Sequence, residues 1–557
     1  MDERKNLTAK ETFTLAFQNQ QKNNLQVAEN LYNEILKTNP NHFESIYLLG
    51  TLLTQKKNFN RSIQLLKKAV QIQPNHASAH NNLGIALISN DVKNYQEAND
   101  CFNKAIKIDP NFAEAFYNLG NLYKEENYEE AKSLYRKALK IKPNYTNAYI
   151  NLGIVSEYCN ESDEAVNCFQ KAANLNPNDP KIYSLIGSVL EKLGMHIAAI
   201  ENYQKALEKR TNIKFEGEKR LHPAIEYFYL ELTNKCNFHC EFCPSDLQNR
   251  SHGFMDISLA KKIFDEIAQK KLVNQVNLHL MGEPTLHPKL NDILIYAKKK
   301  NVKIGLTTNG STLVAKKIPE LLESISGEIT ASLMTPTKET YKIRGDVKLN
   351  WDRYIDNFRL LIQEHLKRIS EGKKNEYNIQ IRIMVSGGDS RKGTVKVVET
   401  PQDIEKNWNI WTTLVKDTEK QLGLKPFNRQ KIDSNTVLSL VNKSGEASYD
   451  VQKNLKINFW RAFTFANSRV SDDYELKYQK TAQYCPRPFT DLGILWNGDV
   501  NPCCLDHDGT LKIGDVRNHS IEAVLHNAAA KKIRGSMYSL EALHPTCQKC
   551  QARPIAK

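Results

Sequence analysis

Proline recurs with an almost constant spacing through the first third of the chain. Pro40, Pro74, Pro110, Pro143 and Pro177 lie 34, 36, 33 and 34 residues apart. A fixed period of about 20 to 50 residues indicates a stack of supersecondary units, each burying its apolar face against the next. This part of the chain is therefore predicted to form a solenoid rather than a globular core.

Each unit of this period repeats the same internal pattern. Glycine follows leucine or isoleucine at Gly50, Gly84, Gly120, Gly153 and Gly187. A small residue, an aromatic residue or leucine, and alanine come next, as at Ala98, Phe102 and Ala105. Those spacings place the three side chains on one helix face, and the small ones let two helices approach closely. A first unit without the glycine and a sixth without the closing proline form the ends, so six repeats are predicted over residues 9–210.

The period and these positions together resemble the tetratricopeptide (TPR) family. The resemblance implies an all-α solenoid whose concave groove binds a peptide or protein. Asn82, Asn118 and Asn151 occupy one repeat position, just before the Leu-Gly pair. Their amides suit either of two roles, hydrogen bonding to an extended peptide backbone or local packing between repeats.

Composition limits the partners and the compartment. Lys plus Arg total 77 against 63 for Asp plus Glu, a formal net charge of +14, but the lysines are scattered rather than blocked. Nucleic-acid binding is therefore not expected. No apolar run of 18 residues occurs and the first ten residues are polar, so neither a membrane span nor a secretory signal is expected. We expect a cytoplasmic protein.

Three cysteines within eight residues dominate the middle of the chain. Residues 225–233 predict a buried strand, and Cys236, Cys240 and Cys243 follow it. In a reducing compartment, clustered thiols bind metal more often than they form disulfides. Three thiolates on one short loop can hold three irons of a 4Fe-4S cube and leave the fourth without a protein ligand. The alternatives are a zinc knuckle with His239 as its fourth ligand and a chance loop.

This spacing resembles the radical S-adenosylmethionine (radical SAM) superfamily. There the motif follows the first strand of a partial (β/α)6 barrel, and the vacant iron binds the methionyl amine and carboxylate of S-adenosylmethionine. Further matches come in the expected order, with MGEP at 281–284, TTNG at 307–310 and a strand ITASLM followed by an Ile-Arg-Gly turn. Two positions depart from the family pattern, Met281 in place of glycine and Met334 in place of aspartate. The resemblance implies cofactor contacts from Phe242, Gly282, Glu283, Asn309, Ser332 and Arg344.

The α/β barrel is predicted to occupy residues 222–470. A fifth strand is expected at 377–385 and a sixth at 456–465. The stretch between them is too long for a plain crossover, so about 387–455 is expected to form a helical insertion or cap. No spacing selects a catalytic proton acceptor among four charged residues near strand ends. These residues, each expected to be structural, are Arg382, Asp389, Arg461 and Asp491.

Five further cysteines crowd the C-terminal end of the chain. Apolar residues alternate around Asn497-Gly498, a turn pair that closes β-hairpins. The hairpin and the helical segment after it would bring together Cys485, Cys503, Cys547 and Cys550. Four thiolates make a closed site that suits either structural zinc or a fully ligated 4Fe-4S cluster.

Residues 480–557 resemble the SPASM or twitch extension of radical SAM enzymes, a small α+β module. The resemblance favours a 4Fe-4S cluster over zinc, and five cysteines are enough for one complete auxiliary cluster. Cys504, beside Cys503, is expected to be a bystander rather than a ligand. The chain as a whole is therefore predicted to be multidomain, with a TPR solenoid, a barrel and an iron-sulfur module in that order.

These resemblances imply an enzyme, a radical SAM oxidoreductase or peptide-modifying enzyme. It would reductively cleave S-adenosylmethionine to a 5'-deoxyadenosyl radical, which abstracts hydrogen from the substrate. A two-electron oxidation or a crosslink would follow. A flavodoxin or ferredoxin would supply electrons, and the clusters imply an anaerobic or low-oxygen setting.

Three substrates or roles stay open at this point. The leading hypothesis is a peptide or protein substrate recruited by the TPR groove, because a groove in cis raises the effective concentration of an extended chain. The second is oxidation of a sugar or aminocyclitol, with the repeats binding a partner protein. The third is a scaffold without catalysis, against which the intact cysteine triplet argues.

Overall fold

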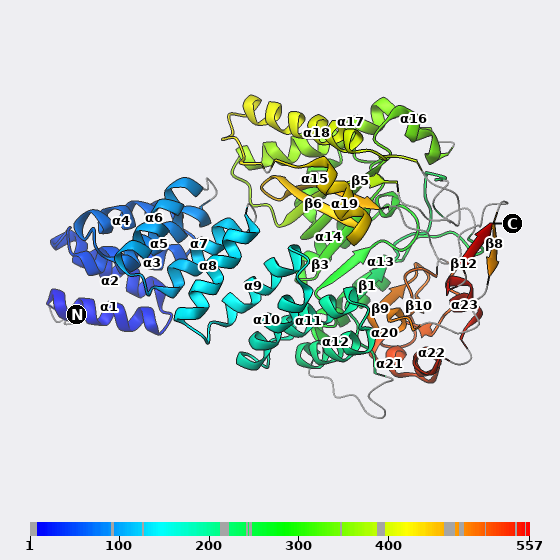
Figure 1. Cartoon of the computed structure of the whole chain (residues 1–557), viewed down its shortest axis with the longest axis horizontal. Helices are drawn as coiled ribbons and strands as arrows, with labels where there is room; N and C mark the ends of the chain where they lie inside the picture. The colour runs from blue at the N-terminus through cyan, green and yellow to red at the C-terminus, as the bar shows by residue number, and fades with distance from the viewer. Residues whose placement is uncertain are drawn as a thin grey trace. The chain divides into compact units, whose positions relative to one another are not determined.

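The structure is a computed structural model that describes the following parts of the chain. The described residues are 8–90, 94–124, 127–211, 222–240, 243, 248–345, 348–386, 396–429, 431–461, 474–477, 484–506, 508–540, 543–551 and 553–556. Phe242 and Asp389 lie outside them. Two compact units divide between Asn178 and Asp179 (Figure 1). In the described part, no helix combines the length and the apolar composition needed to cross a bilayer.

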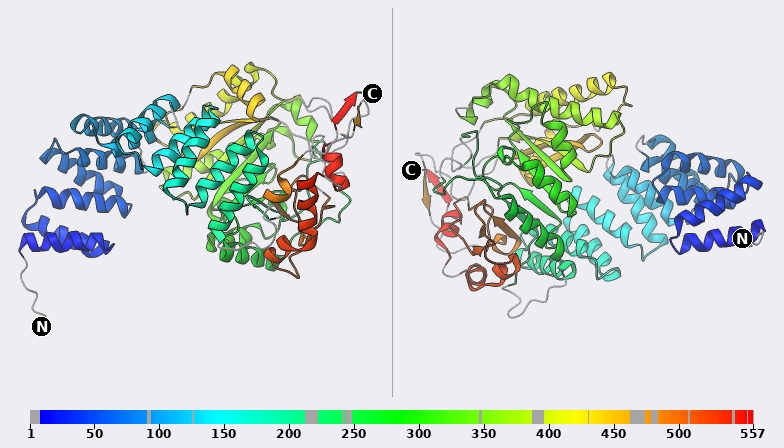
Figure 2. Two further views of the ribbon diagram at one scale, coloured as in Figure 1. Left: turned by 60° about the horizontal axis from the view of Figure 1, so that its bottom comes forward. Right: turned by 180° about the vertical axis from the view of Figure 1, so that it is seen from behind.

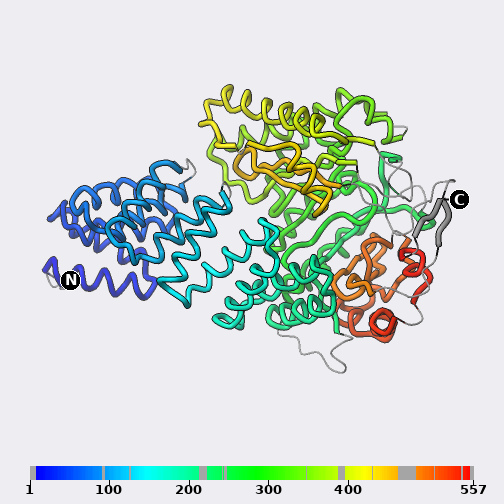
Figure 3. The backbone as a smooth tube through the Cα atoms, in the orientation of Figure 1, coloured from blue at the N-terminus to red at the C-terminus, as the bar shows by residue number. Residues whose placement is uncertain are grey.

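The first unit is a succession of helix pairs. Figure 3 shows the backbone passing from one helix pair to the next in chain order. Among the described residues of this first unit, the ten helices are α1 (Ala9–Gln21), α2 (Leu25–Thr38), α3 (Phe43–Gln55), α4 (Phe59–Ile72), α5 (Ala77–Ser89), α6 (Tyr95–Ile108), α7 (Ala113–Tyr123), α8 (Tyr128–Ile141), α9 (Thr146–Tyr158) and α10 (Ser162–Leu175). This confirms the all-α solenoid predicted from the period.

The glycine of each repeat marks the closest approach within a helix pair. A Cβ atom on Gly153 of α9 would lie 2.6 Å from the ring of Phe169 in α10. The same contact recurs one repeat earlier, where a Cβ on Gly120 would lie 2.7 Å from the ring of Tyr135. The sequence pairs glycine with a buried ring because a ring can fill this gap only where a side chain is missing.

The three asparagines that share one repeat position, Asn82, Asn118 and Asn151, donate hydrogen bonds to the preceding repeat. Asn82 donates from Nδ2 to Tyr47 Oη and Thr51 Oγ1, at 3.1 Å each. Asn151 donates to Asn121 Oδ1 at 2.7 Å. Asn118 donates to an asparagine of the preceding repeat at 2.9 Å. These contacts favour packing between repeats over peptide binding as the role of the three asparagines.

The second unit begins with one more helix pair and continues into a sheet of parallel strands. The pair is α11 (Pro180–Lys192) and α12 (His196–Thr211). The parallel strands are β1 (Tyr227–Leu230), β2 (Gln275–Leu278), β3 (Lys303–Thr308), β4 (Gly327–Met334), β5 (Tyr377–Val385) and β7 (Leu455–Arg461). They are hydrogen-bonded in the order β1-β2-β3-β4-β5-β7. Parallel neighbours in chain order, joined by helices, are the arrangement expected of a partial (β/α)6 barrel.

Helices cover the apolar face of this sheet (Figure 2). They are α13 (Ile257–Lys270), α14 (Leu290–Lys299), α15 (Ile318–Ser324), α17 (Trp351–Ser370) and α18 (Pro401–Gln421). Side chains alternate along each strand, so Ile379, Ile381 and Ile383 of β5 are fully buried in the core. Polar side chains between them, such as Gln380 and Arg382, lie on the other face, which lines the barrel interior.

The stretch expected to be a purely helical insertion contains a strand. Besides α18 and α19 (Ser434–Ser444), it forms β6 (Glu446–Gln452), antiparallel to β7. The turn between them uses Asn454 at φ +58°, a left-handed conformation that asparagine tolerates. The β6 strand becomes the edge of the sheet beside the last barrel strand.

The C-terminal hairpin extends the barrel sheet on its other side. Its strands are β9 (Asp491–Ile494) and β10 (Asp499–Asn501), and the expected turn has Gly498 at φ +89°. The β9 strand pairs in parallel with β1, a contact the sequence pattern did not predict. The remaining elements are α20 (Arg487–Thr490), α21 (Ile521–His526), α22 (Ala528–Ser539), α23 (Pro545–Gln551), β11 (Gly514–Asp515), and β8 (Tyr474–Lys477) paired with β12 (Arg553–Ala556).

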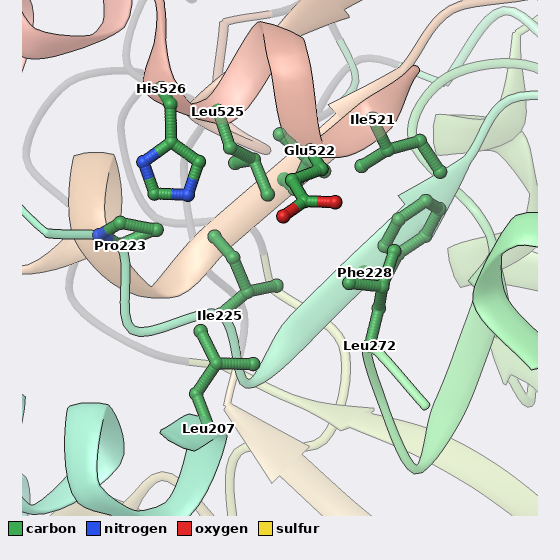
Figure 4. Close-up of a pocket in the computed structure, with 10 residues that line it drawn as sticks. Leu207, Pro223, Ile225, Phe228, Leu272, Ile521, Glu522, Leu525 and His526 are labelled. Atoms are coloured by element: carbon green, nitrogen blue, oxygen red, sulfur yellow. The ribbon is translucent and has the colours of Figure 1, made fainter. Parts of the chain in front are cut away.

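The last helix pair belongs to the second compact unit, which begins at Asp179. Leu207 of α12, Ile225 before β1 and Leu525 of α21 surround an apolar cavity of about 10 Å³ (Figure 4). Beside it, the Arg210 guanidinium lies 3.6 Å from the Glu226 carboxylate, with both side chains almost fully buried. Arg210 also donates to two main-chain carbonyls of the barrel.

Candidate functional site

The cysteine triplet lies on the loop after β1, held by contacts at its base. Thr233 pairs with Phe254 in an isolated bridge, and Asn234 Nδ2 donates to the Ser251 carbonyl at 3.0 Å. Below the loop, the Arg250 guanidinium forms a two-pronged ion pair with the fully buried Glu231 carboxylate, at 2.7 and 2.8 Å. These contacts fix where the loop leaves the sheet.

Residues from the ends of six barrel strands meet at one cavity of about 150 Å³. The cavity is lined by Cys236, Phe238, Cys240, Cys243, His279, Gly282, Glu283, Thr307, Thr308, Asn309, Ser332, Met334, Arg344, Arg382, Met384 and Trp460. All the described residues that sequence reasoning named for the three-cysteine cluster and the cofactor are among them. His279, Arg382 and Trp460 were not assigned to a site from the sequence.

Two polar side chains approach the cysteine sulfurs. Asn309 Nδ2 lies 3.7 Å from Cys236 Sγ, and an Arg344 Nη atom lies 3.6 Å from Cys240 Sγ. Burial, and then the nearby Glu283 carboxylate and the other thiols, raise the pKa of Cys236 to about 12. A metal ion bound to the sulfur would favour the thiolate against this effect of burial.

The Gly-Glu element packs directly against the cysteine loop. Gly282 has φ +77°, and a Cβ there would lie 2.4 Å from the Thr233 carbonyl oxygen. Only glycine fits such a backbone approach. Glu283 N donates to the Lys235 carbonyl at 2.8 Å, one residue before the first cysteine.

Glu283 connects the ends of β2 and β3. Its Oε2 accepts from Asn309 N at 2.6 Å, and its Oε1 accepts from Thr308 Oγ1 at 2.8 Å and from Thr285. Burial raises the pKa of Glu283, and these hydrogen bonds oppose the rise. Oε2 takes one hydrogen bond from the described residues, which leaves it capacity to accept from a bound cation.

A bulge at the end of β4 directs Ser332 into the cavity. The register with β5 shifts between Ser332 and Met334, and Met334 adopts φ +46°. Positive φ at a residue with a long side chain is strained, and such strain is common where a strand end serves a site. The departure from the family pattern at Met334 thus lies in the cavity wall.

Arg344 lies in the cavity wall but is occupied by protein groups. Besides Cys240, its guanidinium donates to the carbonyls of Ser332 and Leu333 at 2.9 and 3.0 Å and to Tyr354 Oη at 2.8 Å. Burial alone would lower the pKa of Arg344, but Tyr354 and Cys240 raise it overall. These contacts favour a role in holding the end of β4 against the cysteine loop rather than direct contact with a cofactor.

A second cavity, of about 70 Å³, lies in the C-terminal module. It is lined by Cys485, Cys503, Cys547 and Cys550, the four cysteines that the sequence analysis groups together. Burial is the largest cause of a raised pKa at Cys485, to about 11, and at Cys547, to about 12. Cys504 is outside the lining and instead lies 3.2 Å from an Arg487 Nη atom.

The other charged residues near strand ends have separate environments. Asp491 is buried and paired with Arg487 at 2.8 Å. Arg461 donates to the Asn442 carbonyl at 2.9 Å, away from the cavity lining. Of the four candidates, Arg382 alone among the described residues lines the cavity.

Comparison with known families identifies the class of each region. Residues 230–389 match the radical SAM superfamily, and residues 485–551 match the SPASM iron-sulfur cluster-binding domain. Tetratricopeptide repeat models match residues 93–126, 122–189 and 180–208, and a model of anaphase-promoting complex subunit 3 matches residues 18–105. The chain thus carries TPR repeats, then a radical SAM domain, then a SPASM domain, which is the domain set of an enzyme.

Individual relatives match parts of the chain. It is 34% identical over 99 residues to the tungsten-containing aldehyde ferredoxin oxidoreductase cofactor-modifying protein of Pyrococcus furiosus, covering 18% of this chain and 28% of that protein. It is 23% identical over 312 residues to the antilisterial bacteriocin subtilosin biosynthesis protein AlbA of Bacillus subtilis, covering 54% and 60%. The solved structure of MamA is 28% identical, with a TM-score of 0.27, covering 31% of this chain and 94% of that one. The chain thus spans 28% to 60% of the two curated relatives.

Radical SAM and SPASM domains bind S-adenosylmethionine and 4Fe-4S clusters, and the residues present fit these groups. Three cysteines line the first cavity and four line the second. In the described part, no three His, Cys, Asp or Glu side chains converge on the position of a single metal ion. In a cube each cysteine binds a different iron, so ligands that line one cavity are the arrangement it requires.

Proposed function

We propose that the chain is a radical SAM enzyme that oxidises or crosslinks a peptide or protein substrate. The observation that carries the proposal is the single cavity on which the cysteine loop, the Gly-Glu element, Asn309 and Ser332 converge from four strand ends. The sequence named these parts from the cysteine motif and from the order of the motifs after it, and sequence spacing alone does not bring them together.

Within this proposal the cysteines Cys236, Cys240 and Cys243 hold the first cluster. When bound, the cluster and S-adenosylmethionine supply a radical that abstracts hydrogen from carbon. Glu283 Oε2 accepts a hydrogen bond from the methionyl ammonium, a charge-assisted contact in a buried setting. Asn309 and Arg344 donate toward the sulfurs and keep their lone pairs oriented.

The second cavity is proposed to hold one auxiliary 4Fe-4S cluster. Cys485, Cys503, Cys547 and Cys550 provide one thiolate for each iron, which leaves no open position for substrate. A closed site of this kind suits electron transfer during a two-electron oxidation. A flavodoxin or ferredoxin is the class of external donor that we propose, in an anaerobic or low-oxygen cytoplasm.

A peptide or protein substrate is favoured by two observations. TPR repeats bind proteins and peptides, and here they precede the catalytic domains in the same chain. AlbA, which matches this chain over 312 residues, is named for the biosynthesis of a bacteriocin.

Anaerobic assays of S-adenosylmethionine cleavage test the proposal. The reconstituted chain with dithionite should form 5'-deoxyadenosine, and Glu283→Gln should lower the affinity for S-adenosylmethionine about tenfold or more, because a neutral amide loses the charge-assisted contact. A control away from the cavity lining, Glu364→Gln on α17, should behave as the wild type. Full cluster loading without any cleavage would contradict the enzyme assignment.

Removal of residues 1–178 separates the two substrate hypotheses. A peptide-directed enzyme should keep uncoupled cleavage of S-adenosylmethionine but lose affinity for its substrate. An enzyme for a sugar or aminocyclitol should keep full turnover after the same truncation.

A further inference from the structure

One wall of the radical SAM cavity carries groups that the cluster and its cofactor do not account for. Arg382 comes from β5, Trp460 from β7, and His279 follows β2. The Arg382 guanidinium carbon lies 5.3 Å from the centre of the Trp460 ring. Two strands separate β2 from β5 in the sheet, yet His279 and Arg382 line the same cavity, and the Arg382 cation acts on the His279 imidazole.

Arg382 is held in one orientation from behind. Its Nε donates to Asn458 Oδ1 at 3.2 Å, and Asn458 Nδ2 donates to Glu446 Oε2 at 3.1 Å and Ser448 Oγ at 2.8 Å. Arginine only donates, so Asn458 must present its oxygen to Arg382 and its nitrogen to β6. The hydrogen bond from Nε restrains the plane of the guanidinium, and the side chain lines the cavity.

The charge of Arg382 is not matched by an ion pair within the described residues. Glu446 and Glu328 are the carboxylates that oppose the loss of its proton, but among the described residues no ion pair joins either of them to Arg382. Glu446 is instead bonded to Asn458, and Glu328 accepts from Thr330 at 3.2 Å. A largely buried cation without a counter-ion is costly, so an anionic ligand would stabilise this wall.

His279 completes the wall as a neutral donor. It makes no hydrogen bond to any other described residue, and it lines the cavity. Burial first, and then the Arg382 cation, lower its pKa to about 4. At neutral pH the imidazole therefore carries one N–H, which can donate to an oxygen between the two side chains.

We propose that Arg382 and His279 together bind one carboxylate of the substrate, with the Trp460 ring supporting the guanidinium. The fork of the guanidinium matches the two oxygens of a carboxylate, and a single cation matches a single negative charge better than it matches a phosphate. On a peptide, that carboxylate belongs either to an acidic side chain or to the C-terminus. This inference rests on the proposed function and names the feature of the substrate that the cavity recognises.

The alternative source of a carboxylate is S-adenosylmethionine itself. Glu283 and Asn309, the residues proposed to hold its methionyl group and cluster, come from the ends of β2 and β3. Arg382 and Trp460 lie on β5 and β7, on the far side of β4 in the strand order, whereas His279 follows the same strand as Glu283. We therefore assign the carboxylate to the substrate, and the experiment below tests both sources.

Calorimetry on the full reconstituted chain with matched peptide probes provides the test. One pair is N-acetyl-glutamate α-methylamide and its glutamine counterpart, and the other is N-acetylglycine and its methylamide. In the presence of S-adenosylmethionine, the wild type should bind one acidic probe about tenfold or more tightly than its neutral partner. Arg382→Gln should abolish that preference, and Arg382→Lys should retain part of it because the charge remains without the fork. Arg359→Gln on the exposed face of α17 is the control and should leave the preference intact.

Each result decides the proposal. A preference for the acidic probe that Arg382→Gln removes, with unchanged affinity for S-adenosylmethionine, supports it, and the responding pair tells a side-chain from a terminal carboxylate. No preference in the wild type, or a loss of S-adenosylmethionine affinity in Arg382→Gln, would overturn it. Iron content and S-adenosylmethionine cleavage, measured on the same samples, report separately on the proposed function and on folding of each variant.

Discussion

At the scale of single residues, the repeat array depends on missing side chains. Every repeat after the first places a glycine in its first helix where the second helix inserts a buried ring or leucine. The helix loses about 1 kcal/mol of propensity at each glycine relative to alanine. The close approach of the two helices that glycine permits outweighs that cost.

Gly153→Ala should therefore destabilise the first unit. The new methyl group would meet the Phe169 ring at 2.6 Å, and overpacking of this kind costs about 1 to 3 kcal/mol, more than the gain in helix propensity. Hydrogen exchange of α9 and α10 should become faster in the variant. Adding Phe169→Leu should recover part of the loss, and strictly additive effects of the two substitutions would contradict a direct contact.

The candidate site divides into residues that sequence reasoning could find and residues that it could not. The cysteines, Glu283 and Asn309 belong to short motifs, so local spacing carries their signal. Along the chain, about 100 residues separate His279 from Arg382, and about 80 separate Arg382 from Trp460. Only the pairing of distant strands brings the three to one cavity. The usable signal was their position near the ends of expected strands, which does not distinguish a cavity residue from a structural one.

At the scale of elements, α17 is connected to the β6–β7 turn by a buried histidine. His365 Nε2 lies 2.9 Å from the Lys453 carbonyl oxygen, and Nδ1 lies 3.5 Å from Tyr377 Oη. Burial is the main cause that lowers the pKa of His365, to about 4. The folded protein therefore holds this imidazole neutral well below the pH at which an unfolded chain protonates it.

Stability of the second unit should fall as the pH drops from about 6.5 to about 4. In that window the unfolded state binds the proton and the folded state does not, so linkage favours unfolding, by up to about 3 kcal/mol for this one group. His365→Gln keeps a donor for the carbonyl but does not titrate, so its unfolding midpoint should depend less on pH. Parallel pH profiles of the variant and the wild type would contradict this assignment.

The strands of the barrel were largely predictable, and their neighbours were not. The fifth strand was expected at 377–385 and occupies those residues, because polar and apolar side chains alternate from Tyr377 to Ile383. The β6 strand was missed inside a polar stretch read as helical. The pairing of β9 with β1 was missed because a parallel contact between segments more than 260 residues apart has no local signal.

At the scale of the whole molecule, the compact unit that carries the catalytic domains includes the last helix pair. The α11–α12 pair contributes Ser184, which donates to the Glu226 carboxylate at 3.1 Å, and Arg210, its partner in the buried ion pair. Removing the pair would leave the buried Glu226 carboxylate without these partners, a change that costs several kcal/mol.

Two truncations test this boundary. The fragment 179–557 should fold with a thermal midpoint close to that of the catalytic unit in the full chain. The fragment 212–557 should be markedly less stable and more sensitive to proteases. Equal stability of the two fragments would mean that α11–α12 contributes nothing to the fold of the second unit.

Two separate cysteine sets are proposed to hold two iron-sulfur clusters. Iron and sulfide counts after anaerobic reconstitution test this proposal most directly. The wild type should hold about eight irons, with about four left when Cys236, Cys240 and Cys243 are replaced by alanine. Replacing the four cysteines of the second cavity should also leave about four, and Cys504→Ala should keep all eight because Cys504 lies outside that cavity. Zinc in place of iron, or an iron count that either set of substitutions leaves unchanged, would contradict the account.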